Sequence, residues 1–482
     1  MAVKSKAVHE GDMSTQSAIQ PDFAARGPAR LASAPVASAG QKLSVVVIAF
    51  IVSLIIPLVF EAGPLRLSAY RTVLALAFFP SLWIWLSGAV GRIRTPDILV
   101  MVFVLWLSVS EIYHQAEGIV EAAGVTTLES LGAYLLGRAF IRNPAQFRKM
   151  AGWLFGICLA LAPFAIYETL TGTNLVMQLW SMVGTTNSDV RMSPRLGLDR
   201  VQGPFDHPIH FGVLFAPVFG LTYFVLGYGR AVVTRFVAAG IVFGIGFLSL
   251  SSGPISSYAV QLMLILWLLT FRWIKGHWWV FLTLALIAYI VVDILSNRTP
   301  IEVAIAYLAL NPTTGYGRII IWEWGWVNIL NNPLFGLGRA NDWERLEWMS
   351  PSFDMYWLLF PMTYGIVAGV AHLGTYLSVF LPLVFRKITD PMLASYRMGW
   401  VTGSLGMLMA GWMVHFWAAP LALHFFLFGC GVWMLSYETS ENEDTPDEDA
   451  TQGRTKPRYS RFAHRPNARE DTPRARPSIR RR

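Results

Sequence analysis

Charged residues are scarce in this chain and cysteine is almost absent. Only 14% of the 482 residues are charged, against roughly 25% in a typical soluble domain. The two cysteines, Cys158 and Cys430, both lie in apolar runs, where we expect packed thiols rather than a disulfide or metal ligands. No convincing P-loop, dinucleotide-binding, HExxH or nucleophile-elbow motif is present. These gaps argue against a soluble domain and against nucleotide-dependent or zinc-hydrolase chemistry.

Apolar sequence is abundant instead, with 54% hydrophobic residues, 19 Trp and 30 Phe. Runs of membrane-spanning length recur between Leu43 and Tyr437, so we predict an all-α, polytopic helical membrane protein with about twelve transmembrane helices. Pro361 predicts a break near the start of the tenth run, which is too long for one upright helix. The runs are approximately 43–60, 72–90, 97–110, 125–141, 150–168, 209–227, 235–250, 254–272, 277–294, 357–385, 398–417 and 420–437.

Polar segments flank the apolar domain, which covers residues 43–437. Residues 1–42 are rich in Ala, Ser and Pro, and residues 438–482 are first acidic and then basic, so both segments are predicted to be disordered. The basic end suits anionic lipid, an acidic partner or a role in fixing topology; we favour the last two, and nothing argues for nucleic acid. Basic residues recur in five short loops, which places those loops and both termini in the cytoplasm.

The opposite face carries the two longest connections, residues 169–208 and 296–356. Because spanning proteins usually keep connections short, we expect function to lie in these loops. In a cell with an outer envelope both loops face the periplasm.

The first long loop is basic and ends in GPFDHPIHFG, residues 203–212. Its arginines suit a diphosphate or a sugar acid, and the alternative is a solvated basic loop. We do not favour a metal site at His207 and His210, because no third strong ligand is evident and Pro208 interrupts the helix. We favour Asp206 as the cap of the following helix. The arginines of this loop are Arg191, Arg195 and Arg200.

The second long loop contains GYGRIIIWEWGWVNILNNPLFGLG, in which a single arginine, Arg318, precedes an apolar, tryptophan-rich helix. An arginine at a membrane surface is well placed to hold a phosphate or diphosphate; the alternative is that it snorkels beside an interfacial tryptophan belt. Trp322 and Trp326 could stack on sugar or contact lipid, and we favour lipid. Asp354, just before the next apolar run, is a candidate general base or a helix N-cap.

Five short motifs occur in order over roughly residues 200–370: RVQGPFDHPIHFG (200–212), LSLSSG (248–253), GRIIIW (317–322), NPLFGLG (332–338) and YGIVAG (364–369). On these motifs the chain resembles the O-antigen ligase and polysaccharide polymerase superfamily of bacterial inner membranes. The resemblance implies a GT-C transmembrane glycosyltransferase fold. It also implies a glycan donor linked to polyprenyl (undecaprenyl) diphosphate and chemistry at the periplasmic face, with no nucleotide sugar, metal or other cofactor.

One position departs from the ligase pattern. The histidine–asparagine pair that ligases carry before the corresponding span is replaced by Asp354 and Met355. The departure favours a polymerase of exopolysaccharide or O-antigen repeat units. In that hypothesis Arg318 and Arg200 stabilise the diphosphate, and Arg191 and Arg195 assist. Asp354 is the base or orients the acceptor, and His207 and Trp322 are further candidates for binding the diphosphate or the glycan.

Two further classes stay open beside the polymerase. A ligase would use the same donor in one transfer to a glycolipid or protein. A non-catalytic transporter or flippase would need polar or charged residues near mid-membrane, and the central spans show few of these. A scaffold of a polysaccharide-export complex stays open, and the long tail suits it. A polymerase would act with a chain-length regulator or export complex as partner.

Overall fold

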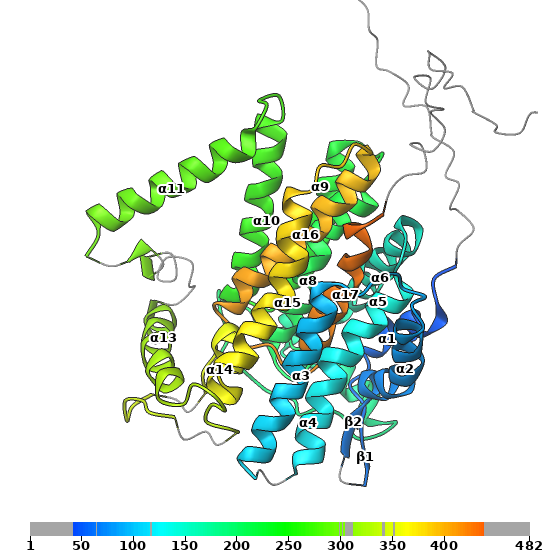
Figure 1. Cartoon of the computed structure of the whole chain (residues 1–482), viewed down its shortest axis with the longest axis vertical. Helices are drawn as coiled ribbons and strands as arrows, with labels where there is room; N and C mark the ends of the chain where they lie inside the picture. Colours follow the sequence, from blue (N-terminus) through cyan, green and yellow to red (C-terminus); the bar gives the residue numbers. More distant parts are fainter. Residues whose placement is uncertain are drawn as a thin grey trace, which may run out of the picture. The chain divides into compact units, whose positions relative to one another are not determined.

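The computed structural model describes residues 42–63, 65–115, 118–297, 299–300, 302–303, 312–339, 343–349 and 352–437. This part of the chain is an all-α membrane protein with one small β-hairpin (Figure 1). Seven of its helices are long and apolar enough to span a membrane. They are α2 (Ala69–Leu86), α3 (Thr95–Tyr113), α6 (Pro144–Thr171), α8 with its π-helical extension η2 (Pro208–Leu226), α10 (Ser252–Phe271), α11 (His277–Leu295) and α15 (Ile366–Phe385).

The other helices of the described residues are shorter or less apolar. Each of the predicted apolar runs contains helix, so the expected helical order is confirmed, whereas only seven helices meet the criteria for a span. The remaining helices are α1 (Val45–Ser53), α4 (Ile119–Thr127), the π-helix η1 (Leu128–Gly132), α5 (Ala133–Phe140), α7 (Leu175–Ser181), α9 (Val232–Phe247), α13 (Pro312–Asn331), α14 (Tyr356–Tyr364), α16 (Pro391–Gly411), α17 (Ala419–Gly431) and the 3-10 helix η3 (Val432–Leu435); η2, already counted with α8, covers Thr222–Leu226.

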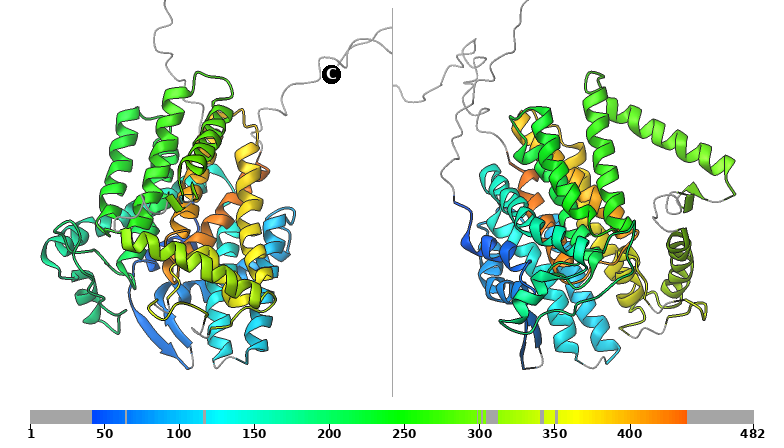
Figure 2. Two further views of the ribbon diagram at one scale, coloured as in Figure 1. Left: turned by 90° about the vertical axis from the view of Figure 1, so that its left-hand side faces the viewer. Right: turned by 180° about the vertical axis from the view of Figure 1, so that it is seen from behind.

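Helix α8 (Pro208–Leu221) lies in the interior and is buried along nearly its whole length. It packs against α9, α10 and α16, while α15 packs against α3 and α17 against α5. The hairpin pairs β1 (Val59–Ala62) with β2 (Leu65–Ser68) in antiparallel register, Glu61 opposite Arg66. In both views of Figure 2 this hairpin and the α3–α4 connection lie at one end of the helices, opposite the α10–α11 turn.

The break in the tenth apolar run lies at Gly365 and not at Pro361. Pro361 is accommodated inside α14, and the chain turns at Gly365, where φ is +87°. A side chain here would be strained, and an added Cβ would lie 1.8 Å from the Leu334 carbonyl oxygen. The prediction of a break is therefore confirmed and its position is corrected: α14 continues past Pro361, whose carbonyl accepts from the Gly365 amide at 3.1 Å, and ends at the glycine with positive φ.

The NPLFGLG segment, residues 332–338, docks onto this break. The Leu337 amide donates to the Met362 carbonyl at 2.8 Å, and the Ile366 amide donates to the Pro333 carbonyl at 2.7 Å. Trp106 of α3 donates its indole N–H to the Leu334 carbonyl at 3.0 Å. The segment thus satisfies main-chain groups that the helix break leaves open.

Candidate functional site

Two arginines from the first long loop bind the turn that precedes α10. Arg200 donates from Nε to the Ser249 carbonyl at 3.2 Å and from one terminal nitrogen to Ser251 Oγ at 2.7 Å. Arg195 donates to the Leu250 carbonyl at 2.9 Å. The Leu250 backbone has φ of +48°, which turns successive carbonyls of this segment toward the loop.

Arg318 reaches the same turn from α13. Its Nε donates to the Met413 carbonyl at 2.7 Å, and one terminal nitrogen lies 3.4 Å from Ser252 Oγ. The residue is only 6% exposed, and its other terminal nitrogen is buried with no partner in the described residues. The structure places Arg318 inside α13 rather than ahead of the helix, and this burial contradicts the snorkelling alternative. We call Arg195, Arg200 and Arg318 the arginine cluster.

The positive charge of the arginine cluster is only partly balanced by nearby negative charge. Burial lowers the pKa of Arg318 to about 10, an effect that the Asp354 carboxylate opposes and Arg195 reinforces. Burial and the same Arg195 also lower the pKa of Arg200 to about 10. Both guanidinium groups stay charged at neutral pH, so three cations share one nearby carboxylate. Such a group of fixed cations favours a multiply charged anion.

Asp354 is exposed, and Ser352 Oγ donates to its carboxylate at 2.9 Å. The N-cap of α14 is Met355, so the alternative that Asp354 caps this helix is wrong. The Asp354 charge acts on Arg318, His207 and His415. Its exposure leaves the carboxylate accessible to an incoming hydroxyl group.

His207, and not Asp206, caps α8. Its Nδ1 accepts from the Ile209 amide at 3.1 Å, with Pro208 in the first turn as expected. Burial lowers the pKa of His207 to about 4, Arg200 and Arg195 lower it further, and Asp354 acts in the opposite direction. The Asp206 cap was a reasonable expectation because Asp and His both supply an acceptor to the first helical amides.

The α16–α17 loop, residues 412–418, connects the arginine cluster to Asp354. Its Met413 carbonyl binds Arg318, and its Val414 carbonyl accepts from the Tyr356 amide at 3.2 Å. His415 lies in this loop beyond the end of α16, although its sequence position predicted a place inside a span. Burial lowers the pKa of His415 to about 4, and Asp354 opposes the shift.

The remaining predicted site residues lie around this centre. Trp322 is 37% exposed, with its ring 5.0 Å from Trp412 and 6.3 Å from Trp326. Arg191 is exposed. Its role stays a prediction.

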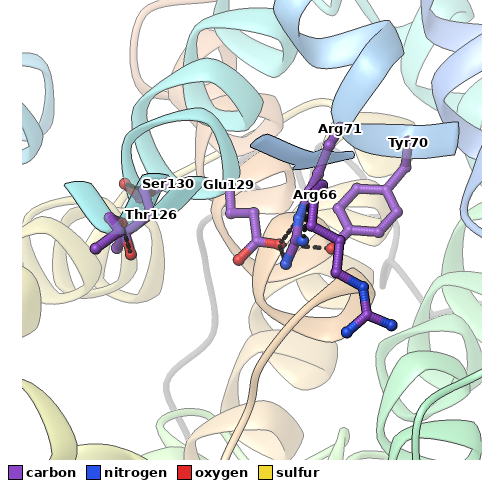
Figure 3. Close-up of polar contacts among 7 residues, drawn as sticks. Arg66, Tyr70, Arg71, Thr126, Glu129 and Ser130 are labelled. Carbon is purple, nitrogen blue, oxygen red and sulfur yellow. Dashed lines mark hydrogen bonds and ion pairs between the residues drawn. The ribbon is translucent and has the colours of Figure 1, made fainter. Parts of the chain in front are cut away.

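A second polar group was missed by the sequence reasoning. Glu129, on the π-helix η1, accepts from Tyr70 Oη at 2.5 Å and from Arg71 Nε at 2.8 Å. Figure 3 shows the side chains of Tyr70 and Arg71, both from the start of α2, directed at Glu129, while the Arg66 side chain is directed away. An acidic residue within the predicted run 125–141 was the available signal, because a charge in an apolar helix needs a partner. We call Tyr70, Arg71 and Glu129 the Glu129 network.

No group of three or more His, Cys, Asp or Glu side chains among the described residues could hold a metal ion. No protein-family model matches the chain, and a search of curated protein sequences finds no significant match. The chemistry of the site therefore rests on its own geometry: three buried or half-buried cations, one exposed carboxylate and two neutral imidazoles at one end of the helices.

Proposed function

We propose that this chain is a transmembrane glycosyltransferase of the GT-C kind that polymerises surface or secreted polysaccharide. Its about twelve spans would hold both termini in the cytoplasm of a bacterial inner membrane and open the site to the periplasm. The donor would be a glycan on polyprenyl diphosphate and the acceptor a sugar hydroxyl. The observation that carries the proposal is Arg318, whose buried guanidinium keeps one nitrogen without a partner beside two other arginines.

The proposed reaction is a glycosyl transfer, and the charges of the site support it. The acceptor oxygen attacks the anomeric carbon of the donor sugar and forms the new glycosidic bond. The bond from that carbon to the phosphate oxygen breaks, and the diphosphate leaves with the electron pair. The acceptor proton passes to the Asp354 carboxylate, which releases it to solvent.

The arginine cluster would stabilise the leaving group. Negative charge grows on the diphosphate as the bond breaks, and donors that are already fixed need no reorganisation at that moment. The Met413 carbonyl holds Arg318 by Nε and Ser252 Oγ lies 3.4 Å from one terminal nitrogen, so the other, buried terminal nitrogen is the donor that a phosphate oxygen would meet once a local opening admits the diphosphate. Bidentate geometry of this kind favours arginine over lysine.

A glycan profile of cells with and without the gene tests the proposal. The profile should cover extracellular polymer and lipid-linked intermediates. Loss of long polymer with single lipid-linked units remaining is the expected result. Long polymer left on its lipid carrier would identify a ligase instead, and an unchanged profile would remove glycan assembly altogether.

A further inference from the structure

Glu168, near the end of α6, binds the main chain just after Arg200. Its Oε1 accepts from the Gln202 amide at 2.7 Å, and its Oε2 accepts from the Gly203 amide at 3.0 Å. The Glu168 side chain is buried, so water does not compete for these bonds. Hydrogen bonds to an ionised acceptor are short, strong and directional. They fix the path of the first long loop on one side of Arg200.

The next residue of α6, Thr169, binds the main chain just before Arg200. Its hydroxyl donates to the Asp199 carbonyl at 2.7 Å, and its own carbonyl accepts from the Asp199 amide at 3.2 Å. The close approach depends on the glycine that ends α6. At Gly172 φ is +67°, and an added Cβ would lie 2.9 Å from the Asp199 carboxylate. Arg200 therefore lies between two pairs of main-chain hydrogen bonds to one helix end.

A further main-chain bond joins this segment to the turn that Arg200 binds. The Val201 amide donates to the Leu248 carbonyl at 3.0 Å. The Arg200 side chain then reaches the Ser249 carbonyl and Ser251 Oγ, as described above. Because the backbone is held on both sides of Arg200, the guanidinium cannot move away from the turn without breaking hydrogen bonds to α6.

The Gln202 side chain extends this arrangement to the rest of the first long loop. Its Nε2 donates to the Ser188 carbonyl at 2.8 Å and to the Phe205 carbonyl at 2.7 Å. Its Oε1 accepts from the Val190 amide at 2.8 Å. The residue is buried, and Val190 directly precedes Arg191. One amide side chain thus binds three separate main-chain groups of the loop and holds its two ends together.

We infer that Glu168, Thr169 and Gln202, which we call the loop clamp, are positioning residues that hold Arg200 where it meets the leaving diphosphate. This inference rests on the proposed function. The loop clamp acts through Arg200 and does not itself bind substrate. Stabilisation of a developing anion requires donors that are fixed before the reaction, and a displacement of about 1 Å can cost roughly 100-fold in rate. Long loops are mobile unless such contacts order them.

A double-mutant cycle between Glu168→Gln and Arg200→Ala tests the inference. The full-length protein is reconstituted in liposomes with the lipid-linked repeat unit from the source cells, and release of polyprenyl diphosphate at saturating substrate gives kcat. Glu168→Gln keeps the shape of the side chain, but its amide NH₂ group faces one of the two main-chain donors. It should lower kcat about 10- to 100-fold.

The cycle separates positioning from a general structural role. In protein that already carries Arg200→Ala, Glu168→Gln should change kcat by less than about twofold, because the side chain through which it acts is gone. A purely structural role would lower kcat by the same factor in both backgrounds, and that result would overturn the inference. An unchanged kcat in the single variant Glu168→Gln would also overturn it.

Thr169→Val keeps the test decisive if Glu168→Gln does not fold. It preserves the shape of the side chain and removes only the bond from the hydroxyl to the Asp199 carbonyl. It should lower kcat about 2- to 10-fold, the size of one neutral hydrogen bond, and lose this effect beside Arg200→Ala. Thr169→Ser keeps the hydroxyl and should restore the wild-type kcat. Equal rates for the valine and serine variants would contradict the role of Thr169.

Asp97→Asn is the matched control. Asp97 is also a buried carboxylate that accepts from a main-chain amide, that of Arg94 at 2.8 Å, but its side-chain partners Tyr134 and Arg138 belong to α5. Asp97→Asn should lower the melting temperature and leave the kcat of the folded protein unchanged. Absence of transfer by the wild type would refute the proposed function and this inference with it. Wild-type transfer with equal losses in both backgrounds would refute the loop clamp alone.

Discussion

Replacement of Arg318 by alanine and by lysine separates charge from geometry at the arginine cluster. Alanine removes a guanidinium that combines an Nε held by the Met413 carbonyl with a buried terminal nitrogen that has no partner in the described residues. Loss of one pre-positioned hydrogen-bond donor to a developing anion raises the activation free energy by about 2.7–4 kcal/mol, which lowers kcat by a factor of about 10² to 10³. Arg318→Ala should therefore reduce polymer formation by that factor.

Lysine at 318 keeps a positive charge but has a single nitrogen. That nitrogen cannot bind the Met413 carbonyl and a phosphate oxygen with the geometry that Arg318 gives. One charge-assisted hydrogen bond is worth about 1.5–3 kcal/mol, so Arg318→Lys should lose about 10-fold or more in rate. The assay is release of polyprenyl diphosphate from lipid-linked donor by reconstituted protein.

The control for this pair is Arg230→Ala, which removes an exposed arginine between η2 and α9. It should keep the wild-type rate. Thermal unfolding of each variant is measured beside the rate, because loss of the bond to Met413 removes a partner from that carbonyl. Full activity of both Arg318 variants at equal protein levels would refute the role assigned to this residue.

Three further predictions follow from other parts of the structure. Asp354→Asn should abolish transfer and leave the melting temperature unchanged, since Asp354 does not cap α14; retained transfer would exclude it as the base. His207 and His415 have pKa values of about 4, so the unfolded chain takes up their protons first as pH falls below about 6.5. The melting temperature should therefore fall as the pH is lowered from about 6.5 to about 4, and a flat profile would contradict the burial of these two histidines. Gly365→Ala should prevent accumulation of folded protein, as measured by gel filtration, whereas Gly156→Ala, with open space around its Cβ position, should not.

The helices could be predicted from the sequence because they lie in continuous runs of apolar residues. The break at Gly365 could not be located, since it depends on the Leu334 and Pro333 carbonyls, which approach from a distant segment. The expected number of spans was set by hydropathy alone, whereas seven helices of the described residues are long and apolar enough to cross a membrane. The difference arises at short or interrupted helices such as α1 and α14.

The candidate site was predictable to the extent that its residues stand out along the chain. Arg200 and Arg318 were selected as loop arginines, and the structure brings both to the turn before α10. His415 and the Glu129 network were not selected for the site, because their partners come from other helices. A pairing between Glu129 and Arg71 is a tertiary contact that no single segment encodes.

The most direct test of the account is a reconstituted transfer reaction with purified protein and a single lipid-linked repeat unit from the source cells. The account predicts a ladder of longer lipid-linked glycans, one molecule of free polyprenyl diphosphate released for each bond formed, and loss of both with Arg318→Ala. Protein that is folded in the membrane, yet yields neither the ladder nor free polyprenyl diphosphate, would contradict it.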